Sequence, residues 1–138
     1  MITLFYAGAL SLLALFLGIK TGQKRHSADE NITIGVGDSF ELLQITRAHG
    51  NLLENVGFFL ILSALLEVVA QIPNLATGVL GDIFLASRIS HAYGITRPGA
   101  ESVFRMLGAI GTVLVLTIQS IWALKISISW LMLNNWGF

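Results

Sequence analysis

The chain has 138 residues, of which 54% are apolar and 12% are charged. Its mean hydropathy is strongly positive, which lies outside the range of soluble domains and predicts an integral membrane protein. The formal net charge is zero and cysteine is absent. The composition therefore excludes a broad basic surface for nucleic acid, a disulfide framework and a thiolate metal site.

Four apolar stretches, each near the roughly 20 residues that span a bilayer, account for nearly all of the chain. We expect helices over residues 2–19, 39–70, 76–94 and 102–125, within one domain that covers residues 1–138. The first stretch lacks the basic start and the small-residue cleavage site of a signal peptide, so we expect it to be retained. Asp38 or Ser39 would cap the second helix, and Pro73 would end it. The sequence thus predicts an all-α fold, an integral membrane four-helix bundle.

The basic residues predict an orientation in the membrane. Only Lys125 falls on the side of the termini, whereas the others fall on or toward the side of the first and third loops: Lys20, Lys24, Arg25, Arg47, Arg88, Arg97 and Arg105. By the positive-inside rule these two loops are cytoplasmic and both termini lie outside.

The stretch RAHGNLLEN, residues 47–55, places Arg47, Asn51 and Glu54 at i, i+4 and i+7 near the start of a long apolar run. This spacing puts the three side chains on one helical face. An arginine, an amide and a carboxylate within a membrane cost free energy unless each has a polar partner. Because their charges suit a small zwitterion, we interpret this face as a candidate binding site.

The third expected helix also carries polar residues. Asp82 lies within it, and Arg88 and His91 share one face of its second half. An ionised side chain at the bilayer centre costs about 2.5–3.5 kcal/mol on insertion scales, so these groups should face protein or a water-filled cleft. A single four-helix chain buries few such faces, which favours an oligomer.

These segments resemble one family. RAHGNLLEN, the apolar run that ends in ALLE (residues 64–67), and SRISHAYG (residues 87–94) resemble the MAPEG family, the membrane-associated proteins in eicosanoid and glutathione metabolism. The preceding IGVGDSFELLQIT (residues 34–46) is similar to the loop of its small bacterial members. The resemblance covers nearly the whole chain in order and spacing.

The resemblance implies a homotrimer of four-helix subunits in a bacterial inner membrane. It also implies glutathione as cosubstrate, held in clefts between neighbouring subunits at the cytoplasmic side. Arg47, Asn51 and Glu54 match the family's glutathione-binding box. Arg88 and His91 match polar residues that line or brace the same cleft.

The catalytic assignment follows from the same resemblance. Arg105 matches, by approximate position, the arginine thought to stabilise the glutathione thiolate in the eicosanoid-synthesising members. A free thiol with a pKa of about 8.5 is mostly protonated at neutral pH, and a nearby guanidinium lowers that pKa. Arg105 and Tyr93 are therefore the candidate catalytic residues. Lipophilic electrophiles would reach the thiolate from the membrane lipid, so the resemblance implies a glutathione transferase, with peroxidase activity as an additional possibility.

Other interpretations stay open from the sequence. Asn55 stands where many members have a tyrosine and Leu43 where some have an acidic residue, so a non-catalytic membrane scaffold or regulatory protein of the same fold is one alternative. A small transporter that uses Asp82 and Glu54 is another, disfavoured because the charges cluster at one membrane face. Each candidate residue also has a structural interpretation, as an interfacial anchor or an interhelical hydrogen-bond partner.

Overall fold

The chain folds into four long helices. The computed structural model describes residues 1–27, 32, 34–98, 102–134 and 136. Its helices are α1 (Ile2–His26), α2 (Phe40–Ala64), a π-helical turn η1 (Leu65–Val69) that continues α2, α3 (Asn74–Ile95) and α4 (Val103–Leu133). This confirms the predicted all-α four-helix bundle. Three segments, namely α1, α2 with η1, and α4, are long and apolar enough to cross a membrane.

Two helices are longer than the sequence pattern predicts. The first was expected to end at residue 19 but continues to His26, because Lys24, Arg25 and His26 in its last turn complement the negative end of the helix dipole. The fourth passes residue 125 and ends at Leu133, because the apolar residues that follow Lys125 include no helix breaker. The predicted cap at the start of α2 is Ser39, whose Oγ accepts a hydrogen bond from the backbone N–H of Leu42 at 3.3 Å.

The third helix differs from the other three. We expected four spanning stretches, but α3 is not among the segments that are apolar enough to be identified as candidate spans. Its sequence carries Asp82, Arg88 and His91 together with many small residues, which lowers its hydropathy. In exchange α3 contacts α1, α2 and α4, and Arg88 and His91 are both buried. Neighbouring helices therefore cover Arg88 and His91, whereas Asp82 lies exposed.

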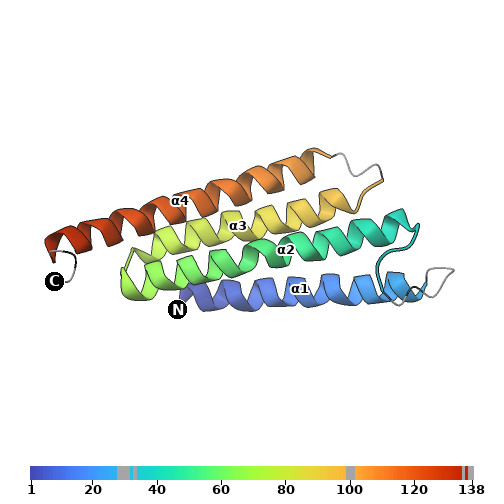
Figure 1. Cartoon of the computed structure of the whole chain (residues 1–138), viewed down its shortest axis with the longest axis horizontal. Helices are drawn as coiled ribbons and strands as arrows, with labels where there is room; N and C mark the ends of the chain where they lie inside the picture. Colours follow the sequence, from blue (N-terminus) through green and yellow to red (C-terminus); the bar gives the residue numbers. More distant parts are fainter. Residues whose placement is uncertain (28–31, 33, 99–101, 135, 137–138) are drawn as a thin grey trace.

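The helices lie lengthwise beside one another, with α1 and α4 on opposite edges in the view of Figure 1. The start of α1, the turn between η1 and α3, and the end of α4 lie at one end of the bundle, and the end of α1, the start of α2, the end of α3 and the start of α4 lie at the other (Figure 1). We call the second end the loop end. All the candidate site residues come from the half of each helix nearer to this end.

The core takes one fully buried side chain from each helix: Leu10, Phe59, Phe84 and Val115. The Phe59 and Phe84 rings stack with a centroid distance of 4.0 Å and an interplanar angle of 5°. Tyr6 packs edge-on against Phe59, and its hydroxyl donates to Asp82 Oδ1 at 2.7 Å. This contact gives Asp82 a structural partner that the sequence pattern did not predict.

Glycines allow α3 and α4 to pack closely. A Cβ added at Gly108 of α4 would lie 2.5 Å from both the backbone N of His91 and the carbonyl O of Ser87. A Cβ at Gly111, one turn later, would lie 2.1 Å from Ser87 Oγ. Small residues allow this approach in a membrane, where lipid provides no hydrophobic drive for helix association.

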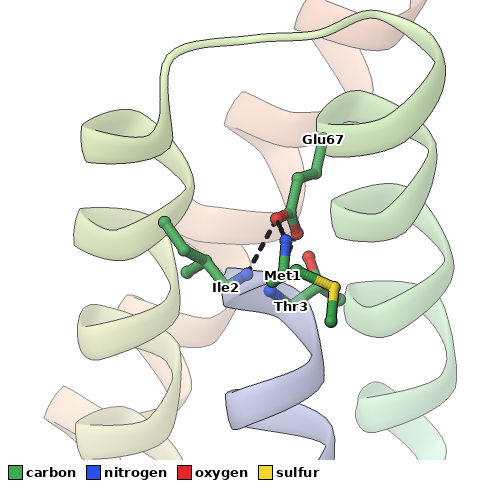
Figure 2. Close-up of polar contacts among 4 residues, drawn as sticks. All are labelled: Met1, Ile2, Thr3 and Glu67. Atoms are coloured by element: carbon green, nitrogen blue, oxygen red, sulfur yellow. Dashed lines mark hydrogen bonds and ion pairs between the residues drawn. The ribbon is translucent and has the colours of Figure 1, made fainter.

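The π-helical turn η1 directs Glu67 toward the start of α1. Its carboxylate accepts hydrogen bonds from the backbone N–H groups of Ile2 at 2.7 Å and Thr3 at 2.8 Å, and it also contacts the amino group of Met1 (Figure 2). The first N–H groups of a helix have no partner within that helix, so a carboxylate placed there satisfies them. Glu67 thus joins the end of α2 to the start of α1.

We predict that Gly108→Ala destabilises the protein by about 1–3 kcal/mol, because the new methyl group meets backbone atoms of α3 that cannot rotate away. Gly111→Ala should cost less, since the Ser87 hydroxyl can change rotamer. Gly78→Ala in α3 is the control, because nothing lies within 4 Å of the added Cβ. Unfolding in detergent, followed by circular dichroism, measures the series. Equal stability of the Gly108 and Gly78 variants would contradict the close approach of α3 and α4.

Candidate functional site

Two charged side chains of the predicted box face outward from α2. Arg47 Nη1 lies 3.8 Å from Glu54 Oε1, and each side chain is 57% exposed. Neighbouring exposed side chains on α2 include Leu53 and Phe58, so the pair stands on a mostly apolar surface. An ion pair at this distance on an exposed face is weak in water. The outward direction leaves both groups available to a ligand or to another chain.

The third residue of the box, Asn51, is engaged inside the bundle. Arg88 Nη1 donates to Asn51 Oδ1 at 2.7 Å and to the Asn51 carbonyl at 3.3 Å, and Arg88 Nη2 donates to the carbonyl of Gly108 at 3.3 Å. Arg88 is only 2% exposed. Its guanidinium therefore links α2, α3 and α4, and it does not share the open face of Arg47 and Glu54. The side chain of Asn55 also turns back, with Nδ2 donating to the Asn51 carbonyl at 2.8 Å.

His91 and Arg105 lie where α3 meets the start of α4. His91 is buried, with its backbone against Gly108. Ser102 caps α4 by accepting from the backbone N–H of Arg105 at 3.2 Å, and a Cβ on Gly94 would lie 2.3 Å from that same nitrogen. The Ser102 cap and the close approach of Gly94 hold the backbone of Arg105 against α3. Arg105 is half-buried. Arg105 therefore lies close to Arg88 and His91 along the length of the bundle.

Tyr93 is part of an exposed cluster. Its hydroxyl contacts the guanidinium of Arg97, which also lies 4.2 Å from the centre of the Tyr93 ring. The ring packs edge-on against Phe104, and Ser90 Oγ donates to the Phe104 carbonyl at 2.8 Å. Arg97 itself is exposed, and its guanidinium lies over the Tyr93 ring. The Tyr93 hydroxyl thus accepts a hydrogen bond from Arg97 within the subunit.

The sequence pattern did not predict a role for Gln44. This side chain is 7% exposed, and its Nε2 donates to the carbonyls of Ile95 at 2.8 Å and Arg97 at 2.7 Å. It closes the end of α3, whose last carbonyls have no partner within the helix. A glutamine three residues before Arg47 carries no distinctive signal in the sequence, because its partners are backbone atoms about 50 positions away.

Comparison with known proteins identifies the family of this chain. A sequence model of the MAPEG family matches residues 3–125, which is most of the chain. The chain belongs to the MAPEG family. A search of curated proteins found no match to it. The MAPEG family includes glutathione transferases and related proteins, and its members are membrane helical bundles.

Membership in the MAPEG family fits the four helices and the three apolar spans of this chain. The matched range includes every candidate residue, from Arg47 in α2 to Arg105 in α4. Within this MAPEG chain the candidates divide into two groups. Asn51, Arg88 and His91 are engaged or buried between helices, while Arg47, Glu54 and Tyr93 are exposed.

We predict that Arg88→Met lowers the free energy of unfolding by about 2–3 kcal/mol, because it leaves the oxygens of Asn51 and Gly108 without their charged donor. Arg97→Met, which removes an exposed guanidinium, is the matched control and should change stability by less than about 0.5 kcal/mol. Unfolding in mixed micelles measures both. A fully stable Arg88→Met protein would show that the three-helix link is dispensable.

Proposed function

We propose that this protein is a glutathione-dependent membrane enzyme that transfers the glutathione thiolate to lipophilic electrophiles, with peroxidase activity toward lipid hydroperoxides as a second reaction. The observation that carries the proposal is the outward-facing pair of Arg47 and Glu54 on an apolar helix. Membership in a family that includes glutathione transferases supports it.

The exposed pair favours an assembly of several chains. Two charges on a helix that crosses a membrane are costly against lipid, so protein, water or a polar ligand should cover them. The bundle itself does not cover them, since each side chain is 57% exposed. We therefore propose a homotrimer in which a neighbouring subunit completes a cleft over this face. The loop end, which carries most of the basic residues, would face the cytoplasm.

Glutathione matches this face chemically. It carries two carboxylates, one ammonium and one thiol. Arg47 supplies a guanidinium that pairs with a carboxylate, and Glu54 supplies a carboxylate that pairs with the ammonium. The present 3.8 Å contact between them would be exchanged for contacts with the peptide. Asn51, held by Arg88, would offer its remaining amide hydrogens to the peptide groups, and His91 would brace the buried side of the cleft.

Arg105 is the group that we propose acts on sulfur. Its guanidinium would favour the thiolate, which forms once the thiol proton leaves to solvent. The thiolate then forms a C–S bond with the electrophilic carbon, while the leaving group departs with its electron pair or, in an addition, the electron pair of the carbon–carbon double bond moves away from the attacked carbon. The Ser102 cap and the contact with Gly94 hold the Arg105 backbone in one position, as a group that must meet a reacting atom requires. Tyr93 is the weaker candidate, because its hydroxyl already contacts Arg97.

We predict that Arg47→Ala and Glu54→Ala each weaken glutathione binding by about 2–4 kcal/mol, because each removes one partner of a desolvated charge pair. Lys125→Ala, at the opposite end of α4, is the control and should leave affinity unchanged. Titration calorimetry on the detergent-solubilised protein measures the three variants. Unchanged affinity in both site variants would restrict Arg47 and Glu54 to a structural role.

We predict that Arg105→Ala lowers turnover by one to several orders of magnitude while glutathione affinity changes little, since other residues hold the carboxylates and the ammonium. The pH–rate profile should shift to higher pH, because the thiol keeps its proton longer. Arg105→Lys should recover part of the activity. The ultraviolet absorbance of bound thiolate reports the effect directly. A thiolate signal that persists equally in Arg105→Ala would assign this role to another residue.

A further inference from the structure

A cleft of about 530 Å³ opens at the loop end, beside the Arg47 face but formed by other residues. Lys20 and Lys24 line it from α1, Phe40, Glu41 and Ile45 line it from the first turns of α2, and Pro98 lines it from the segment after α3. No step of the proposed reaction uses these residues. The cleft is therefore a candidate binding site for a separate ligand.

The cationic side of the cleft is built on one face of α1. Lys20 and Lys24 are separated by one helical turn, so their side chains project in the same direction. Lys24 Nζ bonds Glu41 across the cleft, and Lys20 Nζ lies 5.8 Å from the centre of the Phe16 ring. The lining thus carries two ammonium groups and one carboxylate, of which only Lys24 and Glu41 are in contact. The balance of charge among these lining residues is positive, and it favours an anion.

The rest of the lining is mixed: Gln44 and Thr96 are polar, whereas Phe40, Ile45 and Pro98 are apolar. Phe40 is 55% exposed. An anion alone would leave the apolar residues uncovered, whereas a molecule with a charged head and an apolar stem would contact both kinds of residue. The chemistry of the lining is thus that of an amphiphile.

The position of the cleft along α1 agrees with this chemistry. Phe16 and Ile19, which precede Lys20, are exposed apolar residues, and the charged residues begin immediately afterwards. The cleft therefore lies where the apolar part of the spanning helix ends, which is the depth of lipid headgroups. Basic residues at this depth attract anionic lipids.

We propose that this cleft binds an anionic phospholipid, with the phosphate between Lys20 and Lys24 and the upper acyl chain running along Ile45 toward the membrane interior. The lipid joins α1, α2 and the segment after α3, next to the buried Gln44 that closes α3. A molecule that binds the folded protein across three segments stabilises them together. Glu41 competes with the phosphate for Lys24, so it limits the affinity.

The test uses the full chain in a neutral detergent, titrated with dioleoylphosphatidylglycerol or dioleoylphosphatidylcholine at equal lipid-to-detergent ratios. We expect phosphatidylglycerol to raise the melting temperature clearly more than phosphatidylcholine, and native mass spectrometry to show retained phosphatidylglycerol. The double variant Lys20→Gln/Lys24→Gln should lose this difference. Lys125→Gln, which removes an exposed cation at the other end of the bundle, should keep it. Glu41→Gln should increase lipid retention at least twofold.

Several outcomes would overturn the proposal. Equal effects of the two lipids, or a phosphatidylglycerol effect that survives in the double variant, would show that the cleft does not select an anionic head. Stabilisation by inorganic phosphate alone to the same degree would identify a free anion as the occupant. Because the readouts are stability and lipid retention, they stand apart from any assay of glutathione chemistry.

Discussion

The structure depends most on one buried guanidinium. Arg88 of α3 donates to Asn51 of α2 and to the carbonyl of Gly108 in α4, so a single side chain holds three helices at one level. Removing the guanidinium would leave the oxygens of Asn51 and Gly108 without a donor in an environment without water. Because this loss costs free energy, the link is rigid. The glycine that supplies one acceptor is also the residue that allows α3 and α4 to approach. Electrostatics and close packing therefore reinforce each other at this point.

This link divides the polar residues of the chain into two kinds. Arg88, Asp82 and Glu67 are neutralised or bonded within the subunit, to Asn51, Tyr6 and the start of α1 respectively. These contacts join helices within the subunit. Arg47 and Glu54 remain on the outer face of α2, where only a weak contact joins them. The proposed glutathione site uses Arg47 and Glu54. The contacts of Arg88, Asp82 and Glu67 hold the helices that carry this site.

The loop end combines two surfaces of different chemistry. One carries the outward charges of α2, and the other is the cleft between the lysines of α1 and the first turns of α2. Gln44 lines this cleft and joins α2 to the end of α3. The proposed lipid cleft and the proposed glutathione site both lie toward the loop end.

The sequence by itself determined the membrane class and the four helices. Those features are local, because hydropathy and caps act within one helix. The i, i+4, i+7 spacing placed Arg47, Asn51 and Glu54 on one side of α2, but only the structure showed that Asn51 bonds inward to Arg88 while Arg47 and Glu54 face outward. The sequence did not predict the π-helical turn or the extra turns of α1 and α4, and it could not say which polar residues are already paired. The pairing of Asn51 with Arg88, of Tyr6 with Asp82 and of Glu67 with the start of α1 joins residues 37 to 76 positions apart. Only the packing of the helices decides such contacts, because periodicity gives the face of a helix but not the neighbour that covers it.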